Sequence, residues 1–319
     1  MVRPFILLLC SLGALPTAAA QPCRRVVPVE MMEWPHVELV SQGAPPLREL
    51  RVELKAGDVE RRLLDLDVAM ARVGEEGVIP AAPVPLLVFE IETRIDSVDS
   101  SGLASVSFRY LNADIRPMPG VPISVLRTVR ERVQGLEGTG GEYLLTPCLY
   151  ADSISMTGVE DMDPLLASQM EDLQASIGLL SDPFPDEAVG VGAQWTVKWE
   201  RVESAASHAR TGGIRYDIET LYTVESIDGD RVEIRSELRQ KADMQQIAPP
   251  ELSGQTVVLL SLTSEGAGTQ RWDLSASLPL ESSSQLLTEQ VLMVEQELED
   301  VIETQQIEVR SSLREAPDR

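Results

Sequence analysis

The fold class is decided by the stretch Leu87-Val88-Phe89-Glu90-Ile91-Glu92-Thr93-Arg94-Ile95. Apolar and polar residues alternate along most of it, which is typical of a β-strand with one buried face. Asp99-Ser100-Ser101-Gly102 then supplies a turn, and a second alternating segment follows at Ala104, Val106, Phe108 and Tyr110. The pattern predicts an antiparallel two-stranded hairpin.

The same design recurs later in the chain. An alternating run over Ile214–Val224 leads into Asp228-Gly229-Asp230, a signal for a type I′ turn, and alternation resumes at Val232 and Ile234. The segments Phe89-Glu90-Ile91-Glu92-Thr93 and Tyr216-Asp217-Ile218-Glu219-Thr220 match in kind at every position. The repetition predicts two halves of similar build.

Further strands are expected outward from these hairpins. Leu47–Leu54 and Leu64–Met70 alternate on either side of a turn at Gly57-Asp58, which predicts another hairpin. Strands are also predicted at Trp195–Trp199, at 255–263 and at 268–280. The segment 286–313 fits both a helical and a strand pattern, and its context favours strands.

Two helices are predicted between the halves. Near 122–136, Pro122 suits the first turn and apolar residues recur at helical spacing until Gly138. Near 164–180, Asp163 is an N-cap, Pro164 follows it, and Pro183 lies beyond the end. The apolar stripe of the second helix consists of Leu166, Met170, Leu173, Ile177 and Leu180. Such a stripe packs on the protein's own core in most cases; a partner-binding groove or dimer seam is the alternative.

These elements predict a mainly β (α+β) fold, an antiparallel β-sheet or partial barrel built from two similar halves with one or two amphipathic helices packed on it. The expected order is a signal peptide (1–20), an extended Pro-rich leader (21–46), an N-terminal β half (47–158), a C-terminal β half (159–313) and a tail (314–319). A chain of 319 residues with 43% hydrophobic residues is able to fill such a core.

The first twenty residues have the order of a secretory signal. Arg3 precedes an apolar run over Phe5–Leu15, and the small residues Ala18 and Ala20 predict cleavage after Ala20. An uncleaved anchor would need a longer apolar run, and neither Cys10 nor Cys23 lies in a lipobox. The sequence therefore predicts an exported protein, periplasmic or secreted, with no later transmembrane segment.

After this cleavage Cys23 and Cys148 remain, an even number in an oxidising compartment. The count favours one disulfide between them, and two unpaired thiols are the alternative.

The charge excludes one class of partner. With 51 acidic against 27 basic residues the net charge is −24, and no basic stripe is present to bind a polyanion such as nucleic acid. The acidity favours a solvated, soluble surface over a cation-binding role.

No catalytic, cofactor or metal site is predicted. The chain has two histidines, His36 and His208, and neither lies near a glycine-flanked serine, which argues against a hydrolase. Zinc-binding spacings are absent from the sequence, and Glu160-Asp161-Met162-Asp163 and Asp228-Gly229-Asp230 lack the calcium-loop pattern.

Two further features suggest ligands but have structural interpretations. Gly190-Val191-Gly192 precedes a strand, whereas a phosphate cradle opens a helix, so a turn is the better interpretation. Trp195 and Trp199, two of four tryptophans, are spaced for the same face of a strand, and such residues belong to a core more often than to a sugar platform.

The stretch Phe184-Pro185-Asp186-Glu187-Ala188-Val189-Gly190-Val191-Gly192-Ala193-Gln194-Trp195 resembles a bacterial secreted and lipoprotein family, domain of unknown function 6263. The similar order of features extends over about residues 47 to 313. The resemblance implies an exported, antiparallel β-rich protein and carries over no catalytic residues.

The function expected from the sequence is a non-enzymatic module that binds a hydrophobic ligand or a partner protein outside the cytoplasm. The alternative is a structural or envelope-associated acidic protein without a ligand. The oligomeric state and the ligand are left open by the sequence.

Overall fold

The computed structural model describes residues 35–74, 77–80, 84–158, 183–203, 214–247, 257–294 and 301–317. Within these ranges the chain is mainly antiparallel β-structure with one helix, which confirms the predicted fold class. The predicted signal peptide, most of the predicted leader and the predicted helix near 164–180 lie outside the described residues.

One helix and sixteen strands are described in chain order. They are β1 (His36–Ser41), β2 (Ala44–Arg48), β3 (Val59–Gly74), β4 (Gly77–Pro80), β5 (Leu86–Val98), β6 (Ala104–Arg116), α1 (Ile123–Gln134), β7 (Gly140–Leu145), β8 (Ala151–Thr157), β9 (Val189–Val191), β10 (Gln194–Glu203), β11 (Ile214–Asp228), β12 (Arg231–Ala242), β13 (Gln245–Ile247), β14 (Val257–Asp273), β15 (Glu281–Val294) and β16 (Val301–Glu315).

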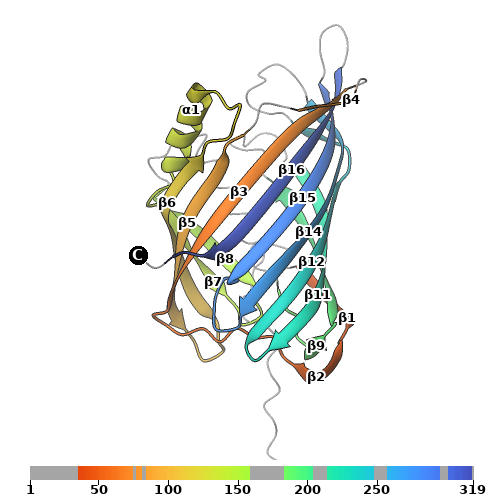
Figure 1. Ribbon diagram of the computed structural model, residues 1–319. Helices are drawn as coiled ribbons and strands as arrows, with labels where there is room; N and C mark the ends of the chain where they lie inside the picture. The colour runs from red at the N-terminus through yellow and green to blue at the C-terminus, as the bar shows by residue number, and fades with distance from the viewer. Residues whose placement is uncertain are drawn as a thin grey trace, which may run out of the picture.

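Fourteen of the described strands form one sheet, and its principal order is β1-β10-β11-β12-β14-β15-β16-β3-β5-β6-β7-β8. The predicted N-terminal and C-terminal halves each occupy a contiguous part of this order, β16 joins them by pairing with β3, and β1, which precedes both halves, pairs with β10. The sheet is tilted and strongly curved, with β1 and β8 at its two edges (Figure 1). The short strands β2 and β9 pair separately.

Both predicted hairpins are confirmed as β5–β6 and β11–β12. The turn type of the second was wrong. Only Gly229 of its two loop residues has a positive φ, +58°, whereas type I′ requires positive φ at both central residues.

The predicted hairpin across Gly57-Asp58 is also wrong in its first strand, because 49–58 contains no strand. The backbone N–H groups of Val52 and Glu53 instead donate to the carbonyl oxygens of Pro147 and Leu274, at 2.8 and 2.7 Å. Leu50 and Val52 are buried in the main core. Their alternation therefore reflects a segment that fills the core without joining a strand ladder.

Three other boundaries differ from the prediction. The strand β1 and the first residues of β2 lie within the stretch 21–46 that was expected to be an extended leader. The two strands predicted over 255–280 are one long strand, β14, which continues through Gly266 and Gly268 and ends at Asp273. The ambiguous segment 286–313 forms β15 and β16, and β16 extends into the predicted tail.

The helix α1 confirms the prediction near 122–136, but Pro122, expected at the first helical position, is its N-cap residue. The helix lies beside β6, and Val133 and Leu136 are buried in the main core while Leu126 and Val129 pack against it. The apolar residues predicted at helical spacing in this segment therefore form the face of α1 that packs on the core.

The curvature brings the two halves together in that core. Trp195 stacks on Tyr222 at a ring distance of 5.3 Å, and its Nε1 donates to the Pro183 carbonyl at 3.1 Å. Phe184 packs edge-on against Trp272 at 5.8 Å. We call this end of the sheet, where Leu50, Phe184, Trp195 and Trp272 meet, the closed end.

Candidate functional site

The two faces of the curved sheet differ in chemistry, and β12 illustrates the difference. Its alternate residues Val232, Ile234, Ser236, Leu238, Gln240 and Ala242 face inward and are buried or half-buried. The intervening residues Arg231, Glu233, Arg235, Glu237, Arg239 and Lys241 are all charged and exposed. The alternation that makes the strand therefore separates a charged outer face from an uncharged inner face.

An apolar strip runs along the inner face of the two strands that join the halves. The cross-strand register places Val68 beside Val309 and Met70 beside Ile307, and Leu286 follows beside Val309. These side chains are half-buried, except that Met70 is 40% exposed. The apolar strip consists of Leu66, Val68, Met70, Leu286, Ile307 and Val309, none of which belongs to the buried core clusters of the described residues.

A hydroxyl strip lies beside the apolar strip on the same face, across β12, β14, β15 and β16. The Ser284 and Ser311 hydroxyls are 2.7 Å apart, and those of Ser264 and Thr288 are 2.8 Å apart. Ser284 is exposed, so solvent reaches the middle of this face. The hydroxyl strip consists of Ser236, Ser264, Ser282, Ser284, Thr288 and Ser311.

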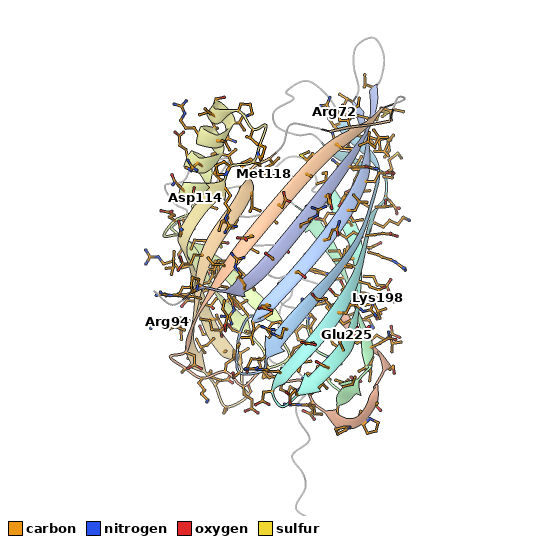
Figure 2. The ribbon with its side chains drawn as sticks, in the orientation of Figure 1. Arg72, Arg94, Asp114, Met118, Lys198 and Glu225 are labelled. Carbon is orange, nitrogen blue, oxygen red and sulfur yellow. The ribbon has the colours of Figure 1, made fainter. Side chains whose placement is uncertain are left out.

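A polar rim ends the inner face away from the closed end. Gln290 Nε2 donates to Gln305 Oε1 at 2.9 Å, and Gln305 Nε2 donates to Glu303 Oε1 at 2.9 Å. Arg72 Nε pairs with the same Glu303 oxygen at 2.8 Å. Figure 2 shows Arg72 at the end of β3, next to β4. The two rim charges compensate each other, so the rim presents no unbalanced charge of its own.

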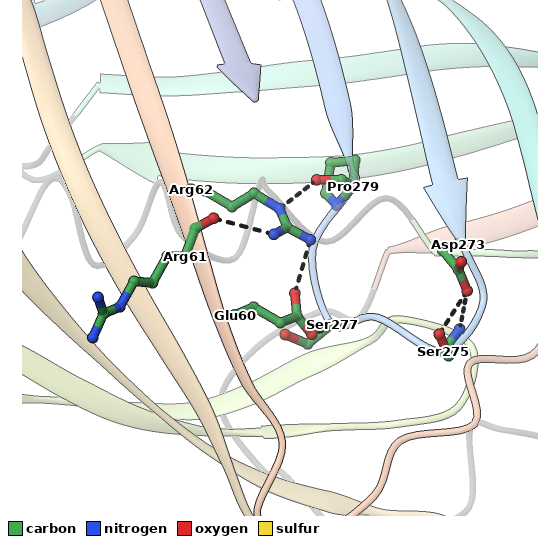
Figure 3. Close-up of polar contacts among 7 residues, drawn as sticks. All are labelled: Glu60, Arg61, Arg62, Asp273, Ser275, Ser277 and Pro279. Atoms are coloured by element: carbon green, nitrogen blue, oxygen red, sulfur yellow. Dashed lines mark hydrogen bonds and ion pairs between the residues drawn. The ribbon is translucent and has the colours of Figure 1, made fainter. Parts of the chain in front are cut away.

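The closed end holds a buried ion pair, Glu60 with Arg62, at 3.2 Å (Figure 3). Arg62 Nε donates to the Pro279 carbonyl at 2.9 Å, and Nη1 donates to the Arg61 carbonyl at 3.2 Å. Glu60 Oε1 accepts the Ser277 backbone N–H at 2.7 Å. The ion pair therefore links β3 by hydrogen bonds to the β14–β15 loop, which is far from β3 in the sequence.

Polar groups gather around this ion pair. Among the described residues, the buried hydroxyls Thr93 Oγ1 and Ser277 Oγ have no hydrogen-bond partner. Burial raises the pKa of Tyr143 above its ordinary value, and the nearby Glu60 charge raises it further. Tyr143 is thus a neutral, buried phenol at physiological pH, with the structural role of a core residue.

Few of the residues considered as catalytic or metal-binding lie in the described part of the chain. His36 is exposed on β1 and lies opposite Lys198 in the register, while His208 and Glu160–Asp163 lie outside the described residues. Asp230 pairs with Arg48 at 3.2 Å, and Arg48 also donates to the Gly229 carbonyl, so this acidic turn has a structural contact. In the described part of the chain, no three His, Cys, Asp or Glu side chains cluster as metal ligands would.

The structural interpretations of the glycine and tryptophan motifs hold in part. Gly192 has a φ of +80° in a turn before β10, whereas Gly190 and Val191 belong to the strand β9. A Cβ on Gly190 would lie 1.9 Å from the Ala44 carbonyl oxygen, so glycine is required by the close approach of β2. Trp195 is a fully buried core residue, and Trp199 is half-buried against a second core cluster.

Cys148 is fully buried between β7 and β8 and packs with Tyr150 and Val37 of β1. Cys23, Ala18 and Ala20 lie outside the described residues. The disulfide and the cleavage position therefore stay predictions.

No protein-family model matches the chain, and no curated protein matches it either. Within the described ranges, no helix has the length and apolarity needed to cross a membrane.

The strips themselves were missed by the sequence reasoning. The alternating residues of β3, β14, β15 and β16 were visible, but their pairing was not, because β3 and its partner β16 are separated by most of the chain. The absence of charged residues at alternate positions of these strands was the available signal.

Proposed function

We propose that the protein is a non-enzymatic module that binds a hydrophobic ligand, or an apolar segment of a partner protein, on the inner face of its curved sheet. The observation that carries the proposal is the apolar strip, whose six apolar side chains lie outside the core clusters of the described residues, five of them half-buried and Met70 exposed. Contiguous apolar surface of this kind marks binding sites more often than it marks free surface.

The length and charge of the strip support an extended apolar ligand. Along β3 the inward residues between Arg62 and Arg72 are Leu64, Leu66, Val68 and Met70, all apolar. Leu64 packs against the core, and at about 3.3 Å per residue the run from Leu66 to Met70 covers roughly 13 Å. An acyl chain or an apolar peptide segment laid along β3 would find apolar side chains of this strand over that distance.

The proposal includes export through the signal at residues 1–20, to the periplasm or the exterior, and membership of the family that the 184–195 stretch resembles. Both rest on sequence features alone. An acidic structural protein without a ligand is the competing function, and it would be favoured by a salt-sensitive association with basic envelope proteins.

The test uses the neutral apolar dye N-phenyl-1-naphthylamine, whose fluorescence rises on transfer from water to an apolar site. Val68→Lys places an ammonium group in the middle of the apolar strip, and we expect at least a tenfold loss of dye affinity. The matched control is Ala69→Lys, which places the same group on the outer face, opposite Glu308. Val68→Thr, which keeps the shape of the side chain, serves as a milder variant should Val68→Lys fail to fold.

Equal dye binding by wild type, Val68→Lys and Val68→Thr would contradict the proposal, and so would a wild-type protein that binds no dye. Native mass spectrometry of protein purified from its own compartment adds an independent readout, because a co-purified lipid should be present in wild type and reduced in the strip variants.

A further inference from the structure

We propose that the inner face selects a lipid whose headgroup is uncharged and carries hydroxyl groups, with its chain on the apolar strip and its headgroup on the hydroxyl strip. This inference rests on the function proposed above and adds the chemistry of the ligand. It follows from the arrangement of two unlike surfaces side by side on one sheet face.

The two surfaces meet in one row across the sheet, and the next row is apolar from Val68 through Val309 to Leu286. In the first row, Leu66 lies opposite Ser311, Ser311 opposite Ser284, and Ser284 opposite Gly268, with Ser236 beyond. The side chains on β3 are aliphatic, and those from β16 to β12 are hydroxyls. A ligand that covers the row must therefore be apolar at one side and hydrogen-bonding at the other.

The hydroxyl groups have capacity left for a ligand. When Ser284 and Ser311 hydrogen bond to each other at 2.7 Å, one O–H group is the donor and the other O–H group stays available. Both oxygens also retain acceptor capacity. Because Ser284 is exposed, a ligand can reach this pair without displacing any described core residue.

The glycine in the row allows the strands to approach closely beside the serines. A Cβ on Gly268 would lie 3.0 Å from Ser236 Oγ, 3.0 Å from the Ser283 carbonyl oxygen and 3.3 Å from Ser284 Cβ. These distances are shorter than ordinary contacts, so a larger residue here would crowd the two serine side chains. With glycine, no aliphatic side chain from β14 interrupts the hydroxyl strip in this row.

The distribution of charge argues against an ionic headgroup. No inward-facing residue of β3 between Arg62 and Arg72, or of β16 between Glu303 and Glu315, is charged. The inward positions described in β12, β14 and β15 are uncharged as well. A charged headgroup would lose hydration here without gaining a counter-ion, which is costly, whereas an alcohol exchanges one hydrogen bond for another.

The experiment compares two amphiphiles with the same twelve-carbon chain, titrated calorimetrically below their critical micelle concentrations into the mature protein. Dodecyl maltoside has an uncharged, hydroxyl-rich headgroup, and dodecyl phosphocholine has a zwitterionic one. We expect dodecyl maltoside to bind at least tenfold more tightly. The double variant Ser284→Ala/Ser311→Ala should abolish most of that preference and leave the affinity for dodecyl phosphocholine unchanged.

The matched control is Thr269→Val/Ser283→Ala, which removes a hydroxyl pair of 3.0 Å from the outer face of β14 and β15. This variant should bind both amphiphiles as wild type does. Equal affinities for the two amphiphiles in wild type, or equal weakening of both by Ser284→Ala/Ser311→Ala, would overturn the headgroup inference while the proposed function stands. Failure of both amphiphiles and of the naphthylamine dye to bind would overturn the proposed function itself.

Discussion

Replacing Arg62 by methionine tests whether the buried ion pair at the closed end holds the two halves of the sheet together. Arg62 is 5% exposed, and the Glu60 side chain is 12% exposed, so solvent screens their interaction only weakly. Methionine preserves most of the apolar stem and removes the guanidinium group. The change leaves Glu60 without its cationic partner, and it leaves the Pro279 and Arg61 carbonyl oxygens without this donor.

The expected cost follows from these contacts. Arg62 donates three hydrogen bonds from a charged group, and each such bond contributes about 1.5–3 kcal/mol. Their sum overestimates the destabilisation by Arg62→Met, because water or neighbouring groups replace part of the lost interactions. Removal of one partner from a buried pair costs about 3–5 kcal/mol, mainly through the charge left behind. We therefore expect Arg62→Met to lower the free energy of unfolding by about 3–5 kcal/mol.

Urea unfolding followed by far-ultraviolet circular dichroism measures this free energy without adding salt. Arg61→Met is the matched control, because Arg61 is the same residue type one position away and points to the other side of β3 (Figure 3). Its side chain is 49% exposed and pairs with Glu92 at 2.8 Å, so its loss should cost about 0–1 kcal/mol.

The double variant Glu60→Gln/Arg62→Met tests whether the destabilisation by Arg62→Met comes from the unpaired Glu60 carboxylate. It removes the uncompensated carboxylate while glutamine still offers an oxygen to the Ser277 N–H group, so it should be more stable than Arg62→Met alone. Equal costs for Arg61→Met and Arg62→Met, or a double variant less stable than Arg62→Met, would refute the role assigned to the pair.

Three further predictions concern the core, the pH response and the cysteines. Trp195→Ala removes a fully buried ring stacked on Tyr222 and should lower the free energy of unfolding by about 3–5 kcal/mol in the same urea assay. The hydroxyl and backbone N–H groups of Ser275 donate hydrogen bonds to the Asp273 carboxylate and hold its pKa below the usual value of 3.8. The ionised carboxylate therefore stabilises the fold above that pH, and this contribution is lost as the pH falls through the folded-state pKa. Asp273→Asn should therefore be less stable than wild type at pH 6, by urea unfolding, with a difference that shrinks below pH 4. A Cys23–Cys148 disulfide would close a loop of about 125 residues and stabilise the fold by about 4–5 kcal/mol, less any strain. Intact-mass measurement of the exported protein should give a chain that begins after the predicted cleavage site, and its mass should rise by two hydrogen atoms when reductant is added. An unchanged mass on reduction would refute the disulfide.

The hairpins were predictable because their information is local. Alternation and a turn signal lie within about thirty residues for β5–β6 and for β11–β12, so a neighbouring strand is implied by the chain itself. The helix α1 was predictable for the same reason, since its spacing and boundary residues lie in one short segment.

Two glycine-containing strands were predicted incorrectly or not at all. The prediction divided 255–280 into strands at 255–263 and 268–280, yet β14 runs through Gly266 and Gly268, and a Cβ on Gly266 would lie 2.9 Å from the Gln285 carbonyl oxygen. The strand β7 was not predicted at all, although it begins with Gly140, where a Cβ would lie 2.1 Å from the Phe108 carbonyl oxygen. These glycines allow neighbouring strands to approach closely, and a single strand's pattern contains no information on that approach.

The candidate site was the least predictable part because it depends on which distant strands become neighbours. The inward positions from Leu64 to Met70 of β3, and Ile307 and Val309 of β16, are apolar in each strand taken separately, which is compatible with an ordinary packed core. The pairing of β16 with β3 and β15 favours a different interpretation of these positions, because the apolar strip then borders Ser284 and Ser311. Alternation in the sequence indicates which residues of one strand share a face. The pairing of strands determines which residues of different strands lie side by side, and so the chemistry of the surface.

The hydroxyl strip is the part of that surface which packing alone explains least. A face designed only to fill a core would carry aliphatic residues on β14 and β15 as it does on β3, because each buried hydroxyl must be hydrogen-bonded to avoid a penalty. Here the penalty is avoided by pairs such as Ser264 with Thr288, and the row nearest the apolar strip leaves Ser284 exposed. That arrangement suits a surface that contacts either water or a hydroxylated ligand. The outer pair Thr269–Ser283 is exposed and lies on the opposite face of the sheet, so the comparison between its removal and the removal of the inner pair Ser284–Ser311 separates the two explanations.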